Sequence, residues 1–363
     1  MISLHINVDG LSPAVLDRAL LYLVRTHQRS VQIAAGAEIQ KGMDYVDRVR
    51  AALPHIIIYW RNLDPEDTGI HAKYSPQWVF DHKVLHYLAW FKRNNVVFVP
   101  DNESSGNDDQ IKAYALWMVS FLILMHAVNL ATAVCRFATG NIQDGTDPRY
   151  PTNQYNLLKP IFSAMLPMDW ISPNEYSNAP GKSSGGHLAR YENMWVAAGK
   201  RLPTSIGEAG ICPDYDPGKG YRSINMSAKA VVEQLTGEEI WYEGGAIDRF
   251  VFSVAINWGG FNLIKEIGDG KVEADVLDEL EKHYAKQPAP VPIPPTPTPP
   301  PVPIPAPGPV EPPKPAPIPQ PPPPGVYETD LRRLAIIRHQ IADLNAEIEA
   351  ILSRYAPAAQ NAA

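Results

Sequence analysis

Short apolar runs alternate with longer stretches of helical periodicity through the first 287 residues. The runs have the length of strands, and the stretches between them carry apolar residues every three to four positions. The eight runs are Ile2–Val8, Val31–Ala35, His55–Trp60, Val96–Val99, Leu130–Phe137, Asp169–Ser172, Thr204–Gly207 and Phe250–Asn257. The helical stretches are Ser12–Thr26, Met43–Leu53, Trp78–Lys92, Ile111–Asn129, Asn153–Met165, His187–Lys200, Ser227–Leu235 and Val276–Lys286. Strands that alternate with helices pair in parallel, because a parallel neighbour requires a long crossover.

Eight strand–helix units in this length predict an α/β fold of the (β/α)8 or TIM-barrel type. A doubly wound open sheet is the alternative, and it would favour a glycine-rich phosphate turn after the first strand. The sequence there, Val8 to Leu11, has no such turn, so the barrel is favoured. The uncharged stretch Ala113–Val134 is long enough to cross a bilayer. Its position between two strand-like runs instead indicates a buried helix of the barrel.

Proline divides the chain into further parts. Of 37 prolines, 22 fall between Pro288 and Pro324, which excludes a packed core there. We therefore expect a barrel domain at 1–287 and an extended polyproline II linker at 288–325. A helix at 326–356 and a disordered tail at 357–363 complete the expected domains.

The expected C-terminal helix carries a heptad seam. Its a positions are Leu334, Ile341, Ile348 and Tyr355, and its d positions are Ile337, Leu344 and Ile351. Such a pattern is typical of a short coiled coil, and isoleucine at both a and d favours three or more strands. We therefore expect a homo-oligomer held through residues 334–355. The alternative is an amphipathic helix that docks on its own barrel or on a partner.

Charge and composition exclude several classes of protein. A net charge of −7 argues against a nucleic-acid partner, which would normally meet a basic face. Two cysteines do not make a disulfide framework. No metal-ligand spacing is present, since His82 and His86 lack a third ligand, so we expect no metal or cofactor. Met1 is followed at once by a strand rather than a secretory leader. We expect a protein that is cytoplasmic, released by lysis or associated with a virion.

Polar and aromatic side chains gather where the predicted strands end, the edge at which barrel enzymes hold their active sites. The third strand ends with Trp60 and Arg61, and the sixth leads into Asn174. Glu103 follows the fourth strand and Glu208 follows the seventh. These strands lie across a barrel from each other, so both carboxylates can face one cleft. A pair of carboxylates 5–5.5 Å apart is what glycoside hydrolysis with retention requires.

This arrangement resembles the clan A glycoside hydrolases, the 4/7 superfamily of retaining barrels, over residues 1–265. The resemblance implies that Glu103, directly after Asn102, is the acid/base and that Glu208 is the nucleophile. It also implies that Tyr176 donates a hydrogen bond to the nucleophile and that Trp258 forms the floor of a sugar subsite. The chain departs from the family because strand two lacks the usual arginine, for which Arg61 can substitute. It also has Asn174 near a position where a histidine is common.

The sequence therefore predicts a retaining glycosidase acting on a poly- or oligosaccharide. Asn102, Tyr176, Trp258, Trp60, Arg61 and Asn174 are the expected substrate-binding residues. Glu175 is the fallback carboxylate if Glu208 is not the nucleophile. The alternative function is a non-catalytic carbohydrate-binding barrel or a structural protein of a virion, presented on an oligomeric stalk.

Overall fold

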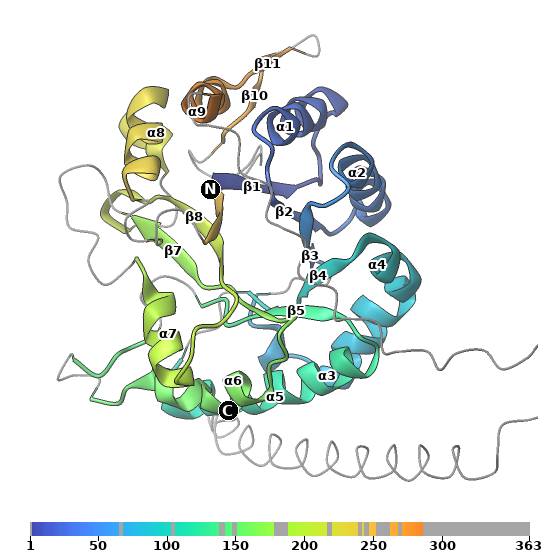
Figure 1. The fold of residues 1–363 in the computed structure, drawn as a ribbon, viewed down its shortest axis with the longest axis vertical. Coiled ribbons are helices and arrows are strands. Elements are labelled where there is room, and N and C mark those ends of the chain that lie inside the picture. The colour runs from blue at the N-terminus through green and yellow to red at the C-terminus, as the bar shows by residue number, and fades with distance from the viewer. Residues whose placement is uncertain are drawn as a thin grey trace, which may run out of the picture.

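A computed structural model describes most of the expected barrel domain (Figure 1). The described residues are 2–64, 68–102, 106–137, 142–146, 151–177, 188–215, 220–238, 242, 247–251, 262–267 and 271–285. The proline-rich linker, the heptad helix and the tail lie outside these residues, and so do Glu103 and Trp258.

Nine strands form one sheet in which every neighbouring pair is parallel. Its order is β6-β5-β4-β3-β2-β1-β9-β8-β7. The strands are β1 (Ile2–Asn7), β2 (Ser30–Ala35), β3 (Ile57–Asn62), β4 (Val96–Val99), β5 (Ala131–Val134), β6 (Trp170–Ile171), β7 (Asn174–Ser177), β8 (Ser205–Ile211) and β9 (Asp248–Val251). A separate antiparallel pair, β10 (Lys265–Glu266) and β11 (Val272–Glu273), follows β9.

The two ends of this order meet, so the sheet is a closed barrel. Strands β6 and β7 stand at opposite ends of the order, yet only Ser172 and Pro173 separate them in the chain. They are two halves of one strand, of which the first pairs with β5 and the second with β8. A parallel bridge between Ile171 and Thr204 joins the first half to the start of β8 as well. Counting β6 and β7 as one gives the eight strands of a (β/α)8 barrel.

Helices surround the barrel (Figure 1), and helical segments separate most successive strands; the exceptions among the described elements are β6, which leads directly into β7, and the run of β9, β10 and β11 before the last helix. The helices are α1 (Pro13–Arg25), α2 (Ile39–Ala52), α3 (Pro76–Val79), α4 (Leu88–Asn94), α5 (Asp108–Ala127), α6 (Lys159–Ala164), α7 (Arg190–Ala198), α8 (Ala228–Gly237) and α9 (Asp275–Ala285). A π-helical turn at Phe80–Val84 and a 3₁₀ turn at Leu85–Tyr87 connect α3 to α4. Side chains begin several of these helices: the Ser12, Ser75, Asn107 and Ser227 oxygens each accept a backbone N–H of the first turn.

Two apolar layers hold the fold together. The larger layer lies between the strands and the helices and contains most of the buried aliphatic and aromatic side chains. The smaller layer fills the inside of the barrel and consists of Tyr59, Val97, Val99, Ala133 and Phe250. The Tyr59 ring meets the Phe250 ring edge-on at 5.0 Å. The barrel interior is therefore a packed core, as in other barrels of this type, and not a pore.

Helix α5 contains the first part of the uncharged stretch Ala113–Val134, whose last residues form β5. Among the described helices it alone is long and apolar enough to cross a membrane, by length and composition only. Ten of its residues are buried, and it packs against α3, α6 and β5. A capping box begins it at Asn107 and Gln110, and it ends at Ala127, before β5. Its apolar surface is thus used inside the fold, as the sequence predicts for a buried helix.

The structure moves two of the expected boundaries. Helix α2 begins at Ile39 instead of Met43, because Gln40 and Lys41 hide the apolar periodicity of its first turn. Strand β8 continues to Ile211, so Glu208 lies within the strand and not after it.

Candidate active site

A layer of polar side chains lies inside the barrel. It is closer to the carboxyl ends of the strands than the smaller apolar layer around Tyr59 and Phe250. Its members are His5 on β1, Gln32 on β2, Arg61 on β3, Asn102 after β4, Arg136 after β5, Asn174 and Tyr176 on β7, and Glu208 on β8. All except the partly exposed Tyr176 are buried. Buried polar groups require partners, so the contacts in this layer define its structure.

Glu208 is the centre of the layer. Its Oε1 atom lies 2.7 Å from Arg61 Nη1 and 2.7 Å from Arg136 Nη2. Its Oε2 atom accepts hydrogen bonds from the Tyr176 hydroxyl at 2.8 Å and from Asn174 Nδ2 at 3.1 Å. Two guanidinium groups and two neutral donors therefore hold one carboxylate whose residue is 1% exposed. Charge-assisted bonds of this kind fix the orientation of the carboxylate plane.

Arg136 connects Glu208 to the neighbouring strands. Its Nε atom donates to Asn102 Oδ1 at 2.9 Å, and its Nη1 atom donates to Gln32 Oε1. Gly207 makes room for it, because a Cβ atom at that position would lie 2.9 Å from Arg136 Cζ and 2.8 Å from Ser172 Oγ. The glycine before Glu208 is thus required by the close approach of the arginine.

Two irregularities of the backbone turn these side chains inward. The pairing of β8 with β9 shifts register between Ile206 and Ala209, so a β-bulge lies at Gly207 and Glu208. Ile206 and Ala209 both belong to the outer core, and the bulge lets Gly207 and Glu208 both face the interior. Bulges often re-aim side chains next to active sites. Cys135 has φ 64° and also lies in the outer core, and this left-handed residue leads into Arg136.

His5 contributes a neutral group to the layer. Its Nδ1 atom lies 3.7 Å from Glu208 Oε1. Burial lowers the pKa of His5 well below its ordinary value, and the charges of Arg61 and Arg136 lower it further. The imidazole is therefore uncharged near neutral pH, and its proximity to Glu208 is not an ion pair.

The structure brings together five of the side chains expected at the site. Arg61, Asn102, Asn174, Tyr176 and Glu208 form one connected network. Arg61 reaches Glu208 from β3, so this arginine does contact the expected nucleophile.

Trp60 is the expected site residue that the structure places elsewhere. It lies in the outer core, 1% exposed, with its ring 5.2 Å from the Trp90 ring and next to Gly42 of α2. Neighbouring residues of a strand point to opposite faces. Because Arg61 faces the interior, Trp60 faces the helices and is a core residue, which corrects the expectation that it binds substrate.

Three members of the layer were not among the expected site residues, and two expected members lie outside the described residues. His5 and Gln32 sit inside apolar runs, where a polar residue at an alternate position is the available signal. Arg136 lies at the carboxyl end of the fifth run, next to its last residue, Phe137, at the edge where functional side chains gather. Glu103 and Trp258 stay predictions, because the structure describes neither of them.

Carboxylates at the first two strand ends hold loops. Asp9 accepts hydrogen bonds from the backbone N–H groups of Gly36, Ala37 and Glu38, at 2.9 to 3.2 Å. Glu38 accepts from the backbone N–H of Gly10 in return and pairs with Lys41 at 3.0 Å. These reciprocal bonds tie the loop after β1 to the loop after β2.

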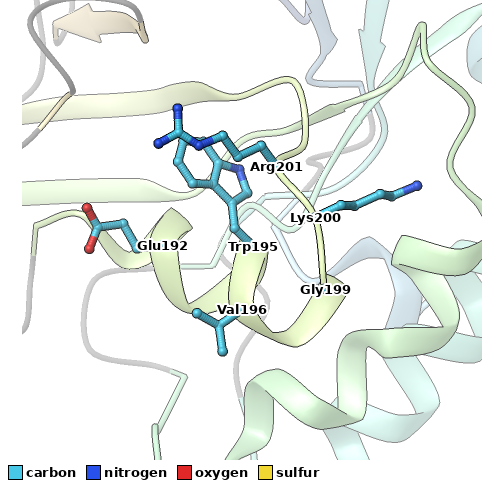
Figure 2. A pocket seen from close by; sticks show the side chains of 6 residues that line it. All are labelled: Glu192, Trp195, Val196, Gly199, Lys200 and Arg201. Atoms are coloured by element: carbon cyan, nitrogen blue, oxygen red, sulfur yellow. The ribbon is translucent and has the colours of Figure 1, made fainter.

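A separate depression of about 450 Å³ lies at the C-terminal end of α7 (Figure 2). Its lining residues are Glu192, Trp195, Val196, Gly199, Lys200 and Arg201. The Arg201 guanidinium lies over the Trp195 ring at 5.1 Å, and the indole N–H donates to Leu202 O and Thr204 Oγ1. This depression precedes β8, so it lies at the opposite end of the strand from Ile211.

Within the described residues, no three His, Cys, Asp or Glu side chains come close enough to hold a metal ion.

Comparisons with known proteins give only distant structural matches. No family model matches the sequence, and no curated protein matches it. A structure of Gas2p from Saccharomyces cerevisiae with laminaripentaose is 13% identical, with a TM-score of 0.48, over 78% of this chain and 64% of that one. Another Gas2 structure, in complex with a small compound, is 12% identical with the same score, over 79% and 64%. The chain thus spans less than two thirds of these proteins. The barrel is defined by the parallel strand pairings of this chain, and the candidate site is defined by the contacts among its own residues.

Proposed function

We propose that the barrel is a retaining glycoside hydrolase that acts on a poly- or oligosaccharide, with Glu208 as nucleophile and Glu103 as acid/base. One observation carries the proposal: a single buried carboxylate is held by Tyr176, Asn174 and Arg61 inside the barrel. Glu208 lies on β8, which is the seventh strand when β6 and β7 are counted as one, and Glu103 comes after β4 in the chain, directly after Asn102. Asn102 already belongs to the network around Glu208 through Arg136.

The reaction would proceed in two steps. A Glu208 oxygen attacks the anomeric carbon while the glycosidic C–O bond breaks, and the departing oxygen takes the proton of Glu103. A water molecule then attacks the anomeric carbon of the glycosyl ester, Glu103 takes a proton from this water, and the Glu208 carboxylate is released. The hydroxyl of Tyr176 and the amide of Asn174 hold the carboxylate in place for the attack. Arg61 and Arg136 balance its negative charge before the sugar arrives.

The first test separates the two glutamates by leaving group. Glu208→Gln should abolish turnover of both activated and natural glycosides, because no nucleophile remains. Glu103→Gln should abolish turnover of natural substrates but still release a first equivalent of a dinitrophenyl leaving group, which departs without a proton. Burst kinetics on a panel of dinitrophenyl glycosides measures the difference. Glu192→Gln, an exposed glutamate on α7, is the matched control and should behave as wild type.

A second candidate function has its own supporting observation. Glu208 Oε1 pairs with two guanidinium groups, Oε2 accepts two hydrogen bonds, and the residue is 1% exposed, as in a purely structural ion cluster. A non-catalytic carbohydrate-binding barrel would require such a cluster only for stability. In that case wild type shows no turnover on the panel, and Glu208→Gln lowers the unfolding temperature without changing any reaction. If wild type does turn over a glycoside of the panel, NMR of the first-formed anomer distinguishes a retaining enzyme from an inverting one.

A further inference from the structure

Glu175 is a buried carboxylate that the proposed reaction does not use. It lies on β7 between Asn174 and Tyr176, the two residues that donate to Glu208 Oε2. These neighbours face the interior, so Glu175 faces the helices, and its strand partner Ala209 lies in the outer core. The residue is fully buried.

The N-terminus of α7 holds this carboxylate. Oε2 accepts the backbone N–H of Ala189 at 2.7 Å, and Oε1 accepts the backbone N–H of Arg190 at 2.8 Å. The same Arg190 donates from Nη1 to the backbone oxygen of Asn174 at 3.4 Å and from Nε to Tyr155 Oη at 3.4 Å. Strand β7 is therefore tied to α7 by a bidentate carboxylate and, more loosely, by the arginine beside it.

Together these contacts place one buried residue between the wall of helices and the carboxylate in the barrel. We propose that Glu175 is a positioning residue for Glu208: it anchors β7 to α7 and so fixes the Asn174 and Tyr176 side chains that hold Glu208 Oε2. The inference deepens the proposed function, and it rests on that function only for its kinetic consequence.

Burial raises the pKa of Glu175 to about 7, against the lowering effects of Arg190 and of the backbone N–H groups of Ala189, Arg190 and Tyr191. The charged or titratable groups that face it are Arg190 from α7 and Tyr242 from the segment before β9.

Beyond these, Arg249 lies 4.4 Å from the Tyr242 ring, and Glu238 interacts with Tyr242. Burial raises the pKa of Tyr242 far above neutral, so Tyr242 stays protonated while Glu175 titrates. Burial also raises the pKa of Glu238. A variant at Glu175 is therefore needed to assign a transition near neutral pH.

The test uses the full chain with ¹³C-labelled tyrosine and ¹⁵N-labelled backbone. In wild type, the ring signal of Tyr176 and the amide signals of Ala189 and Arg190 should shift with one common midpoint near pH 7. Glu175→Gln should remove that transition and displace the Tyr176 ring signal, because a side-chain amide presents an N–H donor to one of the two backbone donors. Glu192 lies exposed on the same first turn of α7, so Glu192→Gln should leave the pH transition and the Tyr176 ring signal unchanged.

Kinetic constants distinguish a residue that positions Glu208 from one that only stabilises the fold. If the barrel is a glycosidase, Glu175→Gln should lower kcat roughly tenfold with little change in KM, because the misplaced carboxylate reacts more slowly once the sugar is bound. A barrel without turnover leaves the NMR test intact, so failure of the proposed function is distinct from failure of this inference. The inference is overturned if Glu175→Gln folds and leaves the Tyr176 ring signal where it stands in wild type, or if that signal titrates in the same way in wild type and in Glu175→Gln. Should that variant not fold, Glu175→Asp replaces it: the shorter carboxylate cannot reach both backbone N–H groups in the same geometry, so it should also displace the Tyr176 ring signal.

Discussion

At the scale of single residues, the interior of this barrel is organised around space as much as charge. Arg136 reaches Glu208, Asn102 and Gln32 only because position 207 has no side chain. Protein interiors are packed as densely as organic crystals, so an added methyl group here has no free volume to enter. The glycine is therefore part of the site although it carries no functional group.

Gly207→Ala should displace Arg136 and lower the free energy of unfolding by about 1–3 kcal/mol, as overpacking of a dense core does. The new Cβ would lie 2.9 Å from the guanidinium carbon and 2.8 Å from Ser172 Oγ. Chemical denaturation of the two proteins measures the change. Gly237→Ala at the end of α8 is the control, since its Cβ meets nothing within 4 Å. Equal stabilities for Gly207→Ala and wild type would show that the arginine moves aside at no cost.

At the scale of elements, apolar runs and helical periodicity were sufficient to predict the eight strand–helix units and their order. They did not reveal which face of each strand is inside. Alternation shows that Trp60 and Arg61 point opposite ways, but the choice depends on Gly42, which lets α2 approach the Trp60 ring. The bulge at Glu208 and the positive φ of Cys135 break alternation through pairing and packing, which the local sequence does not encode.

The loops at the carboxyl ends of the first two strands provide a test at this scale. Asp9→Asn should release the turn before α2, because one amide group cannot accept all three backbone donors that the carboxylate now accepts. We expect a loss of about 1–3 kcal/mol in the free energy of unfolding and faster amide exchange at Gly36, Ala37 and Glu38. Asp44→Asn, an exposed change on α2, is the control for charge. Unchanged exchange at those three amides would contradict a role for Asp9 in holding the loop.

At the scale of the whole molecule, the sequence outside the described residues suggests how barrels are presented. A linker of 38 residues at roughly 3.1 Å per residue reaches on the order of 100 Å when it is polyproline II. Several barrels joined through residues 334–355 would meet a repetitive polysaccharide at neighbouring sites, where effective concentration strengthens retention. Oligomerisation stays a prediction for this chain.

Deletion of residues 326–363 should give a monomer whose activity on a small soluble glycoside is unchanged and whose retention on an insoluble polysaccharide is weaker. Light scattering gives the mass, and a pull-down on the polymer gives the retention. The double change Ile341→Asp and Ile348→Asp should have the same effect, because charges buried in the seam are costly. Equal masses for the full and shortened chains would end the oligomer hypothesis.

The closure of the barrel also affects how the chain folds during synthesis. Strand β1 pairs with β9, and the backbone N–H of Ile2 donates to Tyr284 Oη at 2.8 Å, across 282 residues. Contacts between such distant residues form late, since the intervening loop entropy is lost first. During synthesis, one edge of β1 therefore waits unpaired until β9 and α9 have emerged from the ribosome. An open parallel edge invites pairing with other chains, so a slow passage through this interval favours aggregation, and a faster one favours the native barrel.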